Sequence, residues 1–202
     1  MIRRMAVKFQ LKLPDIILTA AYTAVYFLIT SIAAMFTVFI IPGYSFIFIP
    51  TLVALLSGPI FYLLTLKVPK FGAITFMASI MGIFYLVSGR YPISIFASVI
   101  FGLLADKVAE IGNYQNKTML LLSYILFSFN NIGPVLPMFV FQGSYAEHVT
   151  GTGQDLTTAQ RAMDAISQYS AIAVILAILV SAVIGALIGQ KLINKHFKKA
   201  NH

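Results

Sequence analysis

The sequence predicts an all-α, polytopic membrane protein: a single bundle of six transmembrane helices with both termini in the cytoplasm. Three observations predict this fold class. Of the 202 residues, 59% are hydrophobic and only 10% are charged, a composition that soluble domains do not have. Apolar runs long enough to cross a bilayer recur along the chain. The basic residues gather at the ends of these runs, where they orient membrane helices.

The first three spans are bounded by turn signals and charge. Residues 1–14 are basic and amphipathic, so we expect them to lie on an anionic membrane face. Pro14 fits the first turn of a helix, and Asp15 favours the positive end of its dipole. Gly58 and Pro59 interrupt the second apolar run. The expected spans are roughly residues 15–39, 46–66 and 71–88.

The last three spans follow the same logic. The fourth ends in Asp106, Lys107 and Glu110, which we interpret as a solvated cap at the cytoplasmic end. Residues 112–117 turn the chain into the fifth span. Residues 142–163 form the only long polar segment, and a long loop among short ones is usually functional, for example as a lid, or else a disordered connector. The expected spans are roughly residues 93–111, 118–141 and 164–193.

The distribution of the 14 Lys and Arg residues tests this topology. With six spans, 12 of them fall on the side of the termini, and Arg90 and Arg161 fall on the other side. Basic residues are enriched in cytoplasmic loops. The partition therefore favours six spans with both ends inside the cell, in the plasma membrane of a prokaryote.

The fifth span carries the most unusual stretch of the chain. Asn130 and Asn131 stand beside Gly133, Pro134 and Pro137 within an apolar run. Hydrocarbon offers no partner for a carboxamide or for a carbonyl freed by proline. We therefore expect this stretch to face protein or a water-filled substrate path, with the glycine and prolines bending the helix. The alternative is a purely structural hydrogen bond to a neighbouring helix. Adjacent helical residues point about 100° apart, so one Asn is expected to face the cavity and the other to brace a neighbour.

Other polar residues fall on the predicted outer side and form, with the two asparagines, one candidate ligand site. Arg90 suits a carboxylate or phosphate, or else anchors the chain at the interface. His148 is a possible metal ligand, although a lone loop histidine is more often simply polar. The predicted substrate-binding residues are Tyr44, Arg90, Tyr91, Asn130, Asn131, Gln142, Tyr145 and His148.

Ala20 and Ala24 are four residues apart and share one face of the first span. Small residues at this spacing let another helix approach closely. The partner helix is either outside the chain or the sixth span, which has Gly185 and Gly189 at the same spacing.

No enzymatic constellation is visible in the sequence, and we expect neither a cofactor nor a metal. The chain has no cysteine, and no His lies inside an expected span beside a serine or carboxylate. No basic surface interleaved with aromatic residues suggests nucleic acid. A self-sufficient pump normally needs ionisable residues buried within its spans, and we find none. We therefore expect a binding protein whose energy comes from a partner.

The order of several short motifs resembles the Trep_Strep (MptD-like) family of integral membrane proteins. That family in turn resembles the substrate-binding S components of energy-coupling factor (ECF) transporters. The resemblance covers nearly the whole chain. It is carried by Ala20 and Ala24, residues 70–72, 101–106, 130–137 and 185–192, and the basic tail.

The resemblance implies a subunit that captures a micronutrient from outside and docks on a transmembrane T component with two cytoplasmic ATPases. It also implies that Ala20 and Ala24 contact the T component and that the protein topples in the membrane to release its substrate. The substrate stays open, because a vitamin, a corrinoid and a haem all suit the polar set. The alternatives are a self-sufficient facilitator and an accessory of an intramembrane enzyme.

Overall fold

The computed structural model describes residues 11–41, 44–151, 164 and 170–197, and every regular element in this part of the chain is a helix. The predicted basic segment 1–14 lies mostly outside these residues, as does Arg161. The helices are α1 (Leu13–Ile40), α2 (Ser45–Leu56), α3 (Gly58–Lys67), α4 (Ala73–Val87), α5 (Ile93–Ile111), α6 (Lys117–Ser128), the 3-10 helix η1 (Phe129–Ile132), α7 (Leu136–Val140), α8 (Gln142–Gly151) and α10 (Ser170–Phe197).

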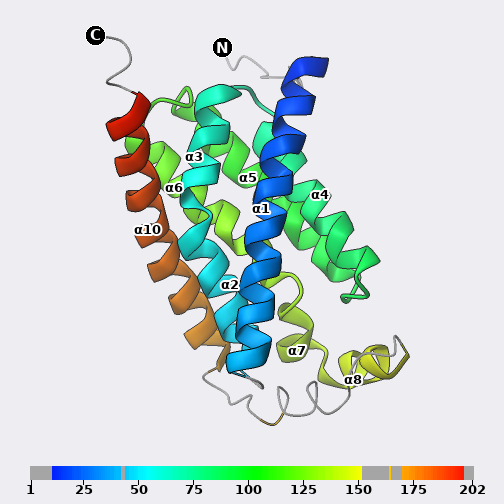
Figure 1. Cartoon of the computed structure of the whole chain (residues 1–202). Coiled ribbons are helices and arrows are strands. Elements are labelled where there is room, and N and C mark those ends of the chain that lie inside the picture. The colour runs from blue at the N-terminus through cyan, green and yellow to red at the C-terminus, as the bar shows by residue number, and fades with distance from the viewer. Residues whose placement is uncertain (1–10, 42–43, 152–163, 165–169, 198–202) are drawn as a thin grey trace, which may run out of the picture.

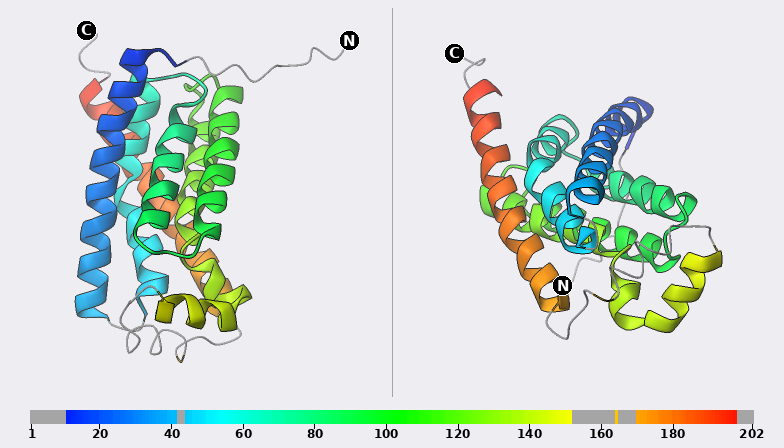
Figure 2. Two further views of the ribbon diagram at one scale, coloured as in Figure 1. Left: turned by 90° about the vertical axis from the view of Figure 1, so that its right-hand side faces the viewer. Right: turned by 60° about the horizontal axis from the view of Figure 1, so that its bottom comes forward.

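The helices lie side by side in one bundle, with α1 and α10 running its full length (Figure 1). The start of α1 and the end of α10 lie at the same end, which we call the terminal end. The short helix α8 lies across the opposite end, which we call the cavity end (Figure 2). Helix α10 packs on α2, α3 and α6, and α1 packs on α2 and α4.

Helix α1 is apolar outside and polar inside, which is the reverse of a soluble helix. Its buried face carries four threonines, Thr19, Thr23, Thr30 and Thr37. All four donate to the carbonyl one turn earlier at 2.5–3.0 Å, so their hydroxyls are satisfied within the helix. Its outer face exposes Ile, Leu, Met and Phe side chains, and Phe39 is 79% exposed. This arrangement suits a helix surrounded by lipid.

Two described helices, α1 and α10, are long and apolar enough to cross a membrane. The pair α2 and α3 qualifies as a third span if its 45° bend is counted within one crossing, while α4 is apolar but shorter. The all-helical fold class and the presence of helices long and apolar enough to cross a membrane are thus confirmed for the described residues, and the six-span count with cytoplasmic termini stays a prediction.

The bend between α2 and α3 falls at Ser57, next to the predicted interruption at Gly58 and Pro59. Proline has no N–H to continue the helical ladder, so carbonyls of the preceding turn lose their partners. The Tyr124 hydroxyl of α6 donates to the Ala54 carbonyl at 2.6 Å and lies 3.1 Å from the Ser57 hydroxyl. A side chain from another helix therefore donates a hydrogen bond to a backbone carbonyl at the break.

The glycines of α10 face this bend rather than α1. A Cβ atom built on Gly185 would collide with the backbone of Ala54 and Leu55, and one on Gly189 would lie 2.9 Å from the backbone of Gly58. Ala20 and Ala24, by contrast, are exposed on α1. The alternative that these alanines pack against the sixth span is therefore wrong, because the glycines of α10 pack against α2 and α3 instead.

The predicted fifth span, 118–141, is not a continuous helix. Helix α6 ends at Ser128, the asparagines lie on the 3-10 helix η1, and α7 begins at Leu136. Proline at 134 and 137 cannot donate to the ladder. Gly133 lets this segment approach α5, since a Cβ atom there would lie 2.9 Å from Ser94 Cα.

Candidate functional site

A cavity of about 640 Å³ lies at the cavity end, between α1, α2, α4, α7 and α8. Its volume is in the range of pockets that hold small organic ligands. The wall is mainly apolar, with a few polar groups. Its lining residues are Thr30, Ser31, Ala34, Val38, Ser45, Phe46, Ile49, Pro50, Phe84, Tyr85, Ser88, Arg90, Asn131, Pro134, Val135, Met138 and Tyr145.

Asn131 lines the deep part of this cavity and is held on three sides. Its amide nitrogen donates to the Tyr26 hydroxyl at 2.8 Å and to the Ser128 carbonyl at 3.2 Å. Its oxygen accepts from the Tyr85 hydroxyl at 2.7 Å. Buried polar groups with several partners are rigid, so Asn131 presents a fixed carboxamide to the cavity.

Asn130 is fully buried and is not among the lining residues. Its amide nitrogen donates to the Phe127 carbonyl at 2.6 Å and contacts the Tyr26 hydroxyl at 3.2 Å. Its side-chain oxygen has no hydrogen-bond partner among the described residues. The two neighbouring asparagines therefore differ: Asn131 faces the cavity and Asn130 ties η1 to α1. The two side chains lie on a 3-10 helix rather than on the α-helix that the sequence predicted, so the angle between them is set by the 3-10 geometry.

Arg90 is positioned by the end of α4. Gly89 has a φ of 75°, which glycine adopts without strain. The Gly89 N–H donates to Leu86 O at 3.1 Å and the Arg90 N–H to Tyr85 O at 2.9 Å, which is the Schellman pattern of helix ends. This turn fixes the backbone from which the Arg90 side chain reaches the cavity lining. Arg90 makes no ion pair with any described residue.

Helix α8 contributes Tyr145, which is 8% exposed and lines the cavity. Burial raises the pKa of Tyr145, and the positive charge of Arg90 opposes this rise. Gln142, another predicted site residue, begins α8, and the placement of its side chain lies outside the description. The first ten residues of the predicted polar loop are thus helical.

His148 and Tyr91 lie behind the cavity rather than in its wall. His148 Nε2 is 3.0 Å from the Gly89 carbonyl, and its ring meets Tyr91 edge-on at 5.2 Å. Tyr91 also stacks on Phe141 at 6.3 Å. These contacts hold α8 against the turn between α4 and α5. No cluster of His, Asp or Glu able to hold a metal ion occurs among the described residues.

The structure brings together three of the eight predicted site residues, Arg90, Asn131 and Tyr145, in the cavity wall. Tyr44 is half exposed at the start of α2 and is not in the lining. Sequence reasoning missed Tyr85 and Thr30. The signal for Thr30 was the line of threonines on one face of α1, whereas Tyr85 had no sequence signal because its partner is 46 residues away.

The interpretation of Asp106 as a solvated cap is wrong, because its side chain is fully buried. Its Oδ2 accepts from the Gly72 N–H at 2.7 Å, the Thr75 N–H at 3.0 Å and the Thr75 hydroxyl at 2.8 Å. Its Oδ1 accepts from the Tyr114 hydroxyl at 2.9 Å. Asp106 therefore caps the start of α4 from another helix. The claim that the spans contain no buried ionisable residue is wrong for the same reason.

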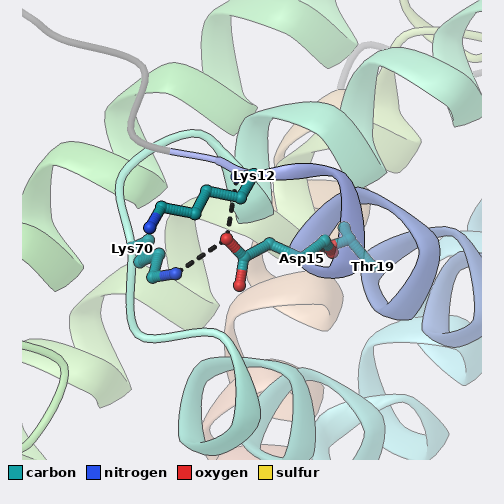
Figure 3. Close-up of polar contacts among 4 residues, drawn as sticks. All are labelled: Lys12, Asp15, Thr19 and Lys70. Atoms are coloured by element: carbon teal, nitrogen blue, oxygen red, sulfur yellow. Dashed lines mark hydrogen bonds and ion pairs between the residues drawn. The ribbon is translucent and has the colours of Figure 1, made fainter.

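A second polar contact between segments distant in the sequence lies at the terminal end of the bundle. Asp15 in the first turn of α1 accepts from the Lys70 ammonium at 2.7 Å and from the Lys12 N–H at 2.8 Å (Figure 3). The Thr19 hydroxyl donates to the Asp15 carbonyl at 2.7 Å. This pair joins α1 to the segment that precedes α4. Lys107 and Glu110 form a separate, half-exposed pair at 2.6 Å.

Comparison with known proteins gives one match. The model of a hypothetical bacterial integral membrane protein family, Trep_Strep, matches residues 13–199. No curated protein and no solved structure matches the chain. Because the match extends over nearly all of the sequence, this chain belongs to the Trep_Strep family of bacterial integral membrane proteins.

Proposed function

We propose that this protein is the substrate-specificity component of an ECF-type importer, which captures a small micronutrient outside the cell. The observation that carries the proposal is the cavity of about 640 Å³ at one end of the bundle. It combines a mainly apolar wall, a rigid carboxamide at Asn131 and an exposed cation at Arg90, as binding sites for small organic ligands do. ATP hydrolysis would be carried out by partner ATPases.

The docking part of the proposal concerns the outer face of α1. Ala20 and Ala24 are both exposed on this face, next to apolar residues such as Ile17 and Leu28. Small residues allow close helix contact in a membrane, where van der Waals packing drives association. These alanines are therefore available to an outside helix, which the proposal takes to be that of the T component.

The test is recovery of the partner module from the native bacterium with the affinity-tagged chain. Wild type should recover one further membrane protein and two ATPases, whereas Ala20→Leu and Ala24→Leu together should reduce ATPase recovery about tenfold or more, because added bulk separates the helices. Ala173→Leu, at an exposed position of α10, is the matched control and should leave recovery unchanged. Normal recovery by the double variant would contradict the docking proposal.

A self-sufficient facilitator remains a second candidate because of one observation, the buried carboxyl of Asp106. Ionisable residues inside spans often mark substrate or ion pathways. All four donors around Asp106 come from within the protein, however, and the residue does not line the cavity. Uptake into liposomes that lack any ATPase would favour this candidate over the importer.

A further inference from the structure

Besides three serines that are not buried, Ser31, Ser45 and Ser88, the polar groups of the cavity lining fall into two sets with different hydrogen-bonding capacity. Thr30, Tyr85 and Asn131 are buried, at most 6% exposed, and we call them the acceptor wall. Arg90 and Tyr145 form the other set, which we call the donor rim. The Arg90 side chain is exposed, whereas the acceptor wall is buried. A ligand in the cavity therefore meets two chemically distinct sets of groups.

The acceptor wall has already donated all of its polar hydrogens inside the protein. Thr30 donates to the Tyr26 carbonyl at 3.0 Å, and Tyr85 donates to Asn131 Oδ1 at 2.7 Å. The two amide hydrogens of Asn131 go to the Tyr26 hydroxyl and the Ser128 carbonyl. A hydroxyl donates once and a primary amide twice, so only oxygen lone pairs remain. A ligand can bond to this wall only as a donor.

The orientation of the Asn131 amide supports this assignment. Oxygen and nitrogen of a carboxamide are distinguished by their hydrogen-bonding partners. The Ser128 carbonyl can only accept, so the atom 3.2 Å from it must be the amide nitrogen. The Asn131 oxygen then points toward Tyr85, with one lone pair used and one to spare.

Among the described residues, the positive charge of the donor rim has no counter-charge. Arg90 makes no ion pair with a described residue, and the described lining contains no Asp or Glu. The Tyr145 hydroxyl likewise makes no hydrogen bond to any described residue. An anionic group on the ligand would gain charge-assisted bonds from Arg90. A cationic donor at the acceptor wall would find neutral oxygens but no Asp or Glu among the described lining residues to offset the loss of its hydration, so a neutral donor is favoured there.

We propose that the cavity binds a singly anionic, amphipathic compound that also carries a neutral N–H or O–H donor. The donor bonds to the oxygens of Thr30, Tyr85 or Asn131, the anion pairs with Arg90, and the apolar part contacts the wall at Phe46 and Phe84. That this compound is imported rests on the proposed function, whereas its binding chemistry rests on the cavity alone.

The test measures binding of three probes to the purified full-length chain in detergent, without any ATPase. The first probe is an aminonaphthoate, whose aromatic amine is uncharged at neutral pH and whose carboxylate is ionised. The second is its dimethylamino analogue, which has lost the donor. The third is its methyl ester, which has lost the anion. Affinities are measured by the fluorescence of the naphthalene ring.

We expect the aminonaphthoate to bind about tenfold or more tightly than either analogue, because the dimethylamino probe leaves buried acceptors unpaired and the ester loses the charge-assisted bond to Arg90. Arg90→Gln should weaken the acid about tenfold and leave the ester unchanged. Lys117→Gln, which removes the same charge from the start of α6, should change neither. Equal affinity for the amino and dimethylamino probes, equal affinity for acid and ester, or binding of none of the three would overturn the proposal. These outcomes are independent of ATPase recovery, so failure of the two proposals can be distinguished.

Discussion

One buried polar cluster surrounds Asp106 and another surrounds Asn131. Both are buried to a similar degree, but they differ in how much of their hydrogen-bonding capacity is left unused. The Asp106 carboxylate accepts four hydrogen bonds from Gly72, Thr75 and Tyr114. Asn131 uses both amide hydrogens and keeps acceptor capacity on the side of a cavity. Burial of a polar residue in a membrane bundle therefore does not identify a binding site by itself. The remaining hydrogen-bonding capacity does.

The helix ends beside the two clusters show the same contrast. Arg90 follows Gly89, which takes its positive φ without strain. At the end of α5, the same pattern of bonds, Asn113 N–H to Glu110 O and Tyr114 N–H to Ala109 O, is built on two non-glycine residues with φ of 48° and 55°. A left-handed residue other than glycine costs about 1 kcal/mol. The hydrogen bond from Tyr114 to Asp106 helps to offset this cost. Such an offset is expected if the cluster around Asp106 has a structural role.

The largest effect should come from Asp106→Leu. This change leaves the four donors of Gly72, Thr75 and Tyr114 without an acceptor, and each buried donor left unsatisfied costs about 1–3 kcal/mol. We expect little folded protein after size-exclusion chromatography in detergent, and a strongly lowered melting temperature for what remains.

Glu110→Gln is the matched control, one turn further along α5. Its pair with Lys107 is half exposed on both sides, so the change should cost no more than about 1 kcal/mol. If Asp106→Leu is as stable as this control, the cluster is not structural, and a coupling role for the carboxyl becomes the better explanation.

The next effect separates the two asparagines. Asn131→Leu removes the carboxamide from the acceptor wall, so aminonaphthoate affinity should fall about tenfold or more. Asn130→Leu removes bonds to Tyr26 and Phe127 but leaves the wall intact. It should lower the free energy of unfolding by about 1–2 kcal/mol with nearly unchanged affinity. Thermal melting and probe titration of both variants measure the two effects, and normal binding by both would place the ligand elsewhere.

The all-helical membrane fold was predictable because it follows from composition and the length of apolar runs, which are local properties. The break at Gly58 and Pro59 and the unusual character of Asn130 and Asn131 were predictable for the same reason. A proline without an N–H and a carboxamide in an apolar run need no knowledge of their neighbours to be noticed.

The partners of these groups were not predictable, because they come from distant parts of the chain. Asp106 looked like a solvated cap beside Lys107, since the donors at 72 and 75 are more than 30 residues away. Tyr85 joins the site only because its hydroxyl reaches Asn131 on η1. His148 and Tyr91 looked like ligand contacts, but they bind each other and the turn at Gly89. Sequence pattern thus identified polar residues on the correct segments without showing which of them face the cavity.

The smallest effect concerns Tyr114, which supplies one of the four donors to Asp106. Burial and the neighbouring Asp106 raise the pKa of Tyr114, so its hydroxyl stays protonated and remains a donor at neutral pH. Tyr114→Phe removes this one bond and should lower the free energy of unfolding by about 1 kcal/mol, seen as a fall of a few degrees in melting temperature. Tyr22→Phe is the control, because the Tyr22 hydroxyl bonds to no described residue. Equal melting temperatures for the two variants would mean that the remaining three donors satisfy Asp106 fully. The cluster around Asp106 would then tolerate the loss of one hydrogen bond, whereas we expect loss of the Asn131 carboxamide from the acceptor wall to weaken binding.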